Sequence, residues 1–289
     1  MNLFEVEVHR FTARPAMRIG CVIVALLIIA GGSLAFAFSS RDVEGATRKE
    51  RARAAAEHQA CLAEAPGDVM RCGEFDADAI HADPRVHLSA IPEVFTNVAG
   101  NLIVLALVFG ASFIGAEWHH RTMTATLTWE SRRARVALAK IAAAATVSFF
   151  AVIALEALLS GSLLPAALFR GTTEGIDGPW LTHTISVGVR VAVLGAFASS
   201  LGASLGLVSR NTAFAIGISF LWIAVLEGIV RGTRPGWGRW LIGDNASSFI
   251  GAQTDTGMRS GLAAGLLLSF YVASIGWVAV AAFRRRDVA

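Results

Sequence analysis

Lysine is nearly absent from this chain of 289 residues, which contains only Lys49 and Lys140. A phosphate-binding loop requires a glycine-rich turn that ends in lysine followed by serine or threonine. Lys49 precedes Glu50 and Lys140 precedes Ile141, so neither lysine meets this requirement. The chain therefore does not bind and hydrolyse ATP through a loop of this kind.

Cysteine and the common catalytic patterns are scarce as well. Cys21, Cys61 and Cys72 are too few for a disulfide scaffold and lack the C-x-x-C spacing of a metal site. His119 and His120 are adjacent, which on a helix points them about 100° apart and disfavours a shared metal ion. There is no basic, aromatic-rich run typical of a nucleic-acid surface. We expect no metal, no cofactor, no nucleic-acid partner and no enzymatic activity of the chain on its own.

Charged residues are also few, at 16% of the chain against 54% hydrophobic residues, and the mean hydropathy is +0.57. This composition is typical of a membrane protein that crosses the bilayer several times. The short alternating segments of a membrane barrel are absent, so the spans are predicted to be helices and the fold all-α. Six apolar stretches have about the 20 residues that a crossing needs: 19–38, 94–115, 141–163, 184–208, 212–230 and 261–283.

The first of these stretches has a second interpretation as a signal peptide. It follows Arg10, Arg14 and Arg18 and ends in Ala35-Phe36-Ala37, which fits the small-residue rule for cleavage. Its length of about 20 residues, however, is that of a span rather than of a signal core. We interpret it as a retained span.

The distribution of basic residues favours one orientation. If both termini are cytoplasmic, the inside segments, including the tail 284–289, hold 12 of the 25 Arg and Lys within about 50 residues. The outside segments hold as many over nearly twice the length, so the basic density favours cytoplasmic termini. We expect a multi-pass protein of a bacterial plasma membrane, with Trp118 and Trp129 at the inner interface.

Three segments outside the spans have patterns of their own. Residues 1–18 carry apolar side chains at helical spacing, which predicts an amphipathic helix on membrane lipids, although an alternating pattern also fits. The outer loop 39–93 contains Cys61 and Cys72, and their pairing in an oxidising compartment is a hypothesis. The outer segment 231–258 is rich in Gly and Trp and is either re-entrant or a plain surface loop.

Ionisable residues inside spans are costly and usually functional. Glu156, Arg190 and Glu227 lie in the third, fourth and fifth spans. Glu156 and Arg190 fall at similar depth on consecutive spans, so they form either a structural ion pair or part of a polar vestibule for a substrate. Gly202 and Gly206 have the spacing that lets two helices approach closely.

The stretch 116–140 concentrates charge between the second and third spans. It holds Glu117, Glu130, four arginines and Lys140. We expect a cytoplasmic connector with a short amphipathic helix that Trp118 and Trp129 anchor at the membrane surface. A basic loop that only fixes the topology is the alternative.

The sequence FIGAEWHHRTMTATLTWESRRARVALAK resembles the connector of the type-two ABC exporter permeases. That connector has an acidic residue, Gly-Thr, a Leu-rich turn, Pro-x-x-Arg and a Lys that opens the third span. The matching positions here are Glu117, Thr122, Leu127, Arg132 or Arg133, and Lys140. Arg121 stands where Gly is usual and Ser131 where Pro is usual.

The resemblance implies the membrane subunit of a transporter that exports drugs, lipids, peptides or antibiotics. It implies two copies of a separate ATP-binding subunit, which would carry ATP and Mg, and a second permease that is identical or a sister chain. The ATPase-coupling residues that it implies are Glu117, Arg121, Thr122, Arg132, Arg133 and Lys140. Two other functions remain open: a secondary transporter or channel, and a membrane sensor or assembly protein that acts through residues 41–92.

Overall fold

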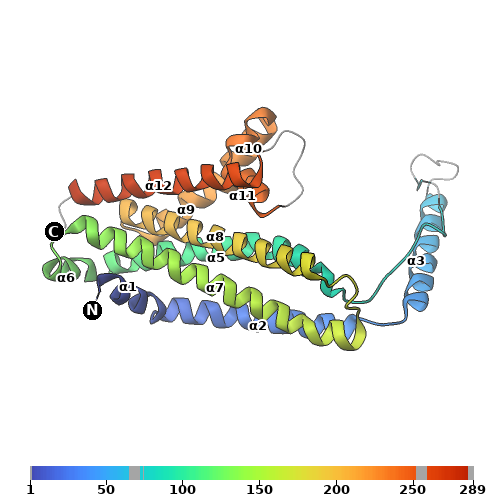
Figure 1. Ribbon diagram of the computed structural model, residues 1–289. Helices are drawn as coiled ribbons and strands as arrows, with labels where there is room; N and C mark the ends of the chain where they lie inside the picture. The colour runs from blue at the N-terminus through green and yellow to red at the C-terminus, as the bar shows by residue number, and fades with distance from the viewer. Residues whose placement is uncertain (1, 65–71, 74, 252–258, 286–289) are drawn as a thin grey trace. The chain divides into compact units, whose positions relative to one another are not determined.

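The computed structural model describes residues 2–64, 72–73, 75–251 and 259–285 (Figure 1). These residues form helices and no strand, apart from one isolated β-bridge between His87 and Thr172. Six helical segments are long and apolar enough to cross a membrane, which makes the chain a multi-pass membrane protein by length and composition. They are α2 (Pro15–Phe38), η1 with α5 (Leu88–His119), α7 (Arg133–Arg170), α8 (Gly178–Ser209), α9 with η2 and α10 (Thr212–Thr233), and α12 (Gly261–Arg285).

The N-terminal segment is helical rather than extended. α1 runs from Leu3 to Thr12, and the Glu5 carboxylate accepts a hydrogen bond from the backbone N–H of Asn2. Pro15 then begins α2, a position where proline fits because the first N–H groups of a helix have no intrahelical acceptor. The chain thus changes direction between two helices at residues 13 and 14.

The segment 39–93 contains a helix that the sequence analysis left out. α3 runs from Val43 to Glu64, and the backbone N–H of Gly45 donates to the Asp42 carboxylate at its start. The segment is rich in Ala, Glu and Arg, which have high helix propensity, but it has no apolar stripe. A search for apolar periodicity misses such a helix because its stability comes from propensity and not from a buried face.

The segment 231–258 also contains regular structure. After α10 (Glu227–Thr233) the chain forms a short 3₁₀ segment, η3 (Pro235–Trp240), and then α11 (Ile242–Ile250), which packs on α12 and α8. Residues 252–258 lie outside the described part of the chain, as do 286–289 of the predicted tail.

The chain divides into two compact units. The smaller unit comprises residues 27–90 and 158–177 and contains α3 and the C-terminal end of α7. Within it, the Arg170 guanidinium donates to the carbonyl of Phe36 at 3.0 Å, and Cys61 forms a disulfide with Cys72.

The disulfide gives a direct prediction for thiol labelling. The chain has three cysteines, and Cys21 is free. We expect the unfolded, unreduced protein to take up one alkyl group, and the reduced protein to take up three, as measured by intact mass. Cys61→Ser is the control and should take up two groups without reduction. Uptake of three groups by the unreduced native sequence would contradict the pairing.

The larger unit comprises residues 1–26, 91–157 and 178–289, and its core is the contact between α5 and α8. Glycines let the two backbones approach closely. A Cβ added at Gly110 would lie 2.0 Å from the carbonyl oxygen of Ser199, and one at Gly202 would lie 2.2 Å from that of Leu107. The Gly202 and Gly206 pair noted in the sequence therefore faces α5 within the same chain.

Candidate functional site

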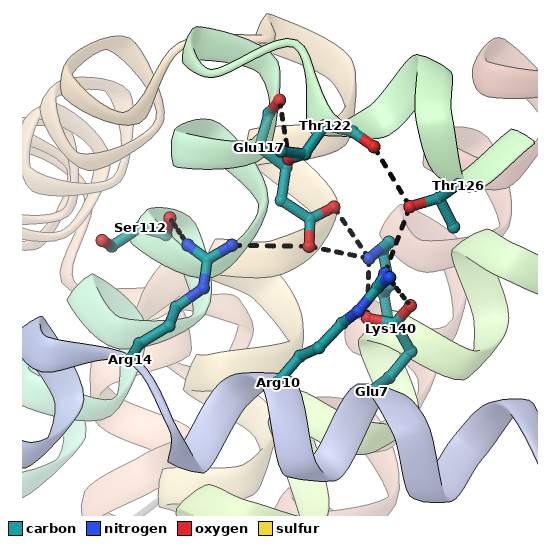
Figure 2. Close-up of polar contacts among 8 residues, drawn as sticks. All are labelled: Glu7, Arg10, Arg14, Ser112, Glu117, Thr122, Thr126 and Lys140. Atoms are coloured by element: carbon teal, nitrogen blue, oxygen red, sulfur yellow. Dashed lines mark hydrogen bonds and ion pairs between the residues drawn. The ribbon is translucent and has the colours of Figure 1, made fainter.

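A buried lysine lies at the centre of the candidate site, in the larger unit. α7 carries Lys140 near its start, and the side chain is fully buried. Its ammonium group lies 2.7 Å from the Glu7 Oε2 and 2.7 Å from the Glu117 Oε2 (Figure 2). Glu7 belongs to α1 and Glu117 to the end of α5, so the lysine joins three helices.

Two arginines of the N-terminal segment also contact these carboxylates. Arg14 contacts Glu117 at 3.4 Å and donates to the carbonyl of Ser112 at 3.1 Å. Arg10 contacts Glu7 at 3.2 Å and donates to the hydroxyl of Thr126 at 3.1 Å. We call Glu7, Arg10, Arg14, Glu117 and Lys140 the charged cluster.

Burial lowers the pKa of the Arg14 guanidinium below its ordinary value. Loss of solvation lowers the pKa of its guanidinium, while the carboxylates of Glu117 and Glu7 raise it. The group stays protonated, because arginine remains charged throughout the physiological range. The cluster therefore keeps three cationic groups around two carboxylates.

An aromatic ring forms one wall of the cluster. The guanidinium carbon of Arg14 lies 4.9 Å from the centre of the Phe113 ring, and the Lys140 ammonium lies 5.3 Å from it. Phe11 of α1 packs on the same ring, with 4.6 Å between the two centroids. Cations over an aromatic face are attracted to it, most strongly where water is excluded. Burial and aromatic contact therefore both hold α1 in place.

The connector between α5 and α7 contains the short helix α6 (Thr122–Trp129). The Thr122 hydroxyl donates to the carbonyl of Glu117 at 3.4 Å, and Thr126 lies buried beside Arg10. Arg121 precedes α6 with φ of 55°, in the left-handed region that glycine adopts most easily. This conformation gives a physical reason for the glycine that the resembled connectors usually have at this position.

The sequence-predicted coupling residues separate into two groups. Glu117 and Lys140 are buried in the cluster, and Thr122 touches the Glu117 backbone. Arg121 and Arg132 are exposed, and Arg133 is half-buried. The exposed arginines lie beside α6. The connector therefore has buried charged residues at its two ends and a solvent-accessible basic surface between them.

The two tryptophans of the connector, Trp118 and Trp129, differ in their surroundings. Trp118 packs edge-on against Phe283 of α12 at 6.1 Å, and the Arg210 guanidinium lies 4.5 Å from its ring centre. This half-buried tryptophan therefore packs between helices. Trp129, at the end of α6, is 91% exposed.

Glu156 lies in α7 and Arg190 in α8. Arg190 donates to the carbonyl of Phe249 in α11 at 3.3 Å. Glu156 is buried, and its carboxylate lies against Gly188 of α8, 3.2 Å from where a Cβ would be.

Glu227 is also buried, and it caps a helix. Its two carboxylate oxygens accept the backbone N–H groups of Ile242 and Gly243 at 2.8 and 2.9 Å, at the first turn of α11. A carboxylate at this place satisfies N–H groups that lack intrahelical acceptors and favours the helix dipole. Glu227 therefore stabilises the start of α11.

The sequence analysis missed the part of the cluster on α1. Leu3, Glu7 and Phe11 are four residues apart and so share one face of the helix. Phe11 is 1% exposed and Glu7 is fully buried. A carboxylate on the apolar face of an amphipathic helix is the signal that would have predicted a buried cationic partner.

The cluster links three helices, and among the described residues it has no arrangement typical of a catalytic or metal centre. Among the described residues, no group of three or more His, Cys, Asp or Glu side chains is placed to hold a metal ion. Comparison of the chain with protein-family models, with curated proteins and with solved structures gave no match.

Proposed function

We propose that this chain is the permease subunit of an ATP-driven ABC exporter in a bacterial plasma membrane. One observation carries the proposal: the charged cluster joins α1 and the connector between α5 and α7 into one buried polar centre. A transporter driven by a separate ATPase needs such a joint, because a push on the connector must reach several helices together.

The energetics of the cluster support this role. Breaking a buried ion pair leaves a charge without its partner and costs about 3–5 kcal/mol. Lys140 contacts carboxylates from α1 and α5 at once, so moving either helix away from α7 would incur that cost. The starts of α1 and α7 and the end of α5 are therefore expected to move as one body.

The surface of the connector supports docking of an ATPase. Trp129 is 91% exposed at the end of α6, and the exposed Arg121 and Arg132 flank the same helix. Under the proposed orientation, both termini and this surface are cytoplasmic. The disulfide in the smaller unit then lies on the outer side, where disulfides persist. Two ATP-binding subunits, with ATP and Mg, and a second permease would complete the transporter.

The test is co-purification from the native membrane. We expect an ABC-type ATP-binding subunit, recognised by its phosphate-binding loop, to co-purify with the tagged chain. The double variant Trp129→Ala, Arg132→Ala should reduce the recovered ATPase by about ten-fold without lowering the unfolding temperature, because both side chains are exposed. Arg53→Ala, an exposed arginine of α3, is the matched control and should retain the ATPase.

Recovery of no such ATPase from membranes of the native host would contradict the proposal. A second candidate, a sensor or assembly protein, would then be favoured by a different observation: the segment 41–92 contains the helix α3 and the Cys61–Cys72 disulfide.

A further inference from the structure

The fifth membrane-spanning segment is not a uniform α-helix. α9 (Thr212–Phe220) packs against α5 and α8, and α10 is attached to α11 through Glu227. Between them, Leu221–Leu226 form a π-helical turn, η2. π-Helical turns are rare and are frequently found at functional sites, because they interrupt the regular hydrogen-bond ladder.

A cavity of about 380 Å³ lies beside this turn, within the larger unit. Trp222 and Ile223 of η2 form one side, Leu201 and Leu205 of α8 another, and Tyr271 and Ile275 of α12 a third. A volume of this size is within the range of about 300–1,000 Å³ found for small-molecule sites.

The walls of the cavity are suited to an apolar group. Among the residues that the structure describes, no charged side chain lines it. The Ser219 hydroxyl donates to the carbonyl of Ala215 at 2.8 Å, and the Tyr271 hydroxyl donates to that of Trp240 at 3.1 Å. Both hydroxyl protons are therefore already used within the protein, and burial of an apolar ligand here would leave few polar groups unsatisfied.

Positive charge gathers at one side of the cavity. Trp240 lines it, and the guanidinium carbon of Arg259 lies 4.5 Å from the centre of that ring, with that of Arg239 at 5.9 Å. Arg259 also donates to the carbonyl of Arg239 at 3.1 Å, which holds the two residues together. Within the described residues, neither guanidinium forms an ion pair.

We infer that this cavity binds an amphipathic molecule with an anionic head, its apolar chain between η2 and α12 and its head at Arg239 and Arg259. Guanidinium groups bind carboxylates and phosphates through paired hydrogen bonds, which supplies the head-group preference. The inference deepens the proposed function by naming a substrate class, and as a substrate site it rests on that function. Binding itself does not require the ATPase.

Quenching of tryptophan fluorescence by dibromostearate tests the inference on the purified chain in detergent. We expect saturable quenching that Trp222→Phe reduces and that Leu205→Phe, which places a ring in the cavity without adding a tryptophan, also reduces. Trp277→Phe is the control, because this tryptophan is 73% exposed on α12 and does not line the cavity. Its removal should leave the saturable component in place.

Charge recognition is tested with the uncharged dibromostearyl alcohol. The double variant Arg239→Gln, Arg259→Gln should bind dibromostearate about ten-fold more weakly and bind the alcohol as the native chain does, whereas Arg53→Gln should change neither. Quenching that rises linearly without saturation, or equally for acid and alcohol, would overturn the inference.

The source of the ligand is assigned in the complex with the ATPase. Stimulation of ATP hydrolysis by stearate identifies the occupant as a transported substrate, and saturable binding without stimulation identifies it as a bilayer lipid with the same chemistry. If no ATPase is recovered but saturable, charge-dependent quenching persists, the proposed function fails and the binding site stands.

Discussion

Lys140→Met is expected to lower the free energy of unfolding by about 3–5 kcal/mol, because it leaves the carboxylates of Glu7 and Glu117 buried without their shared cation. Methionine keeps the length and the apolar stem of the side chain, so the loss reflects charge more than volume. Thermal unfolding in detergent, followed by circular dichroism, measures the effect.

The chain offers a matched control in its only other lysine. Lys49 is exposed on α3, and Lys49→Met should change stability by less than about 0.5 kcal/mol. Adding Glu7→Gln and Glu117→Gln to Lys140→Met should recover part of the loss, because neutral amides cost less to bury than carboxylates that have lost their lysine partner. A similar drop for both lysine variants, or no recovery in the triple variant, would show that the cluster does not carry this energy.

Gly110→Ala is expected to destabilise the fold by about 1–3 kcal/mol or more, although alanine is the better helix former. The added Cβ would lie 2.0 Å from the carbonyl oxygen of Ser199, a backbone atom of α8 that cannot move without shifting the helix. The recovered folded fraction and the unfolding temperature after extraction in detergent are the measurements.

Gly100→Ala on the same helix should change the stability in the opposite direction. A Cβ there meets nothing within 4 Å, so the substitution should be neutral or stabilise by up to about 1 kcal/mol through helix propensity. If both alanines stabilise the chain, the close approach of α5 and α8 is wrong. If both destabilise it equally, the effect comes from the helix rather than from the contact.

The six spans could be predicted from the sequence because the cost of placing charge in lipid forces long uncharged runs, and such runs are visible in one dimension. α3 could not be found in this way, since an apolar pattern is not what stabilises it. The ends of the spans also differ from the prediction. α7 begins at Arg133 rather than at Ile141, because the basic residues before Ile141 continue the same helix.

The site was predictable only in part. The resemblance to a connector predicted Glu117 and Lys140 as site residues. It did not predict Glu7, which contacts Lys140 from a helix more than a hundred residues earlier in the chain. The contacts of Arg190 and Glu227 are with backbone groups, namely the carbonyl of Phe249 and the N–H groups at the start of α11. Every residue has these backbone groups, so no side-chain pattern in the sequence predicts which of them will be contacted.

The burial of Lys140 has a consequence for labelling chemistry. Amine-reactive dyes and cross-linkers attack side chains only through a solvent-accessible primary amine, and the ammonium of Lys140 has no exposed surface. In the folded chain Lys49, on α3, is then the single lysine open to them. A fluorophore attached to Lys49 would report on the smaller unit and leave Lys140 unmodified.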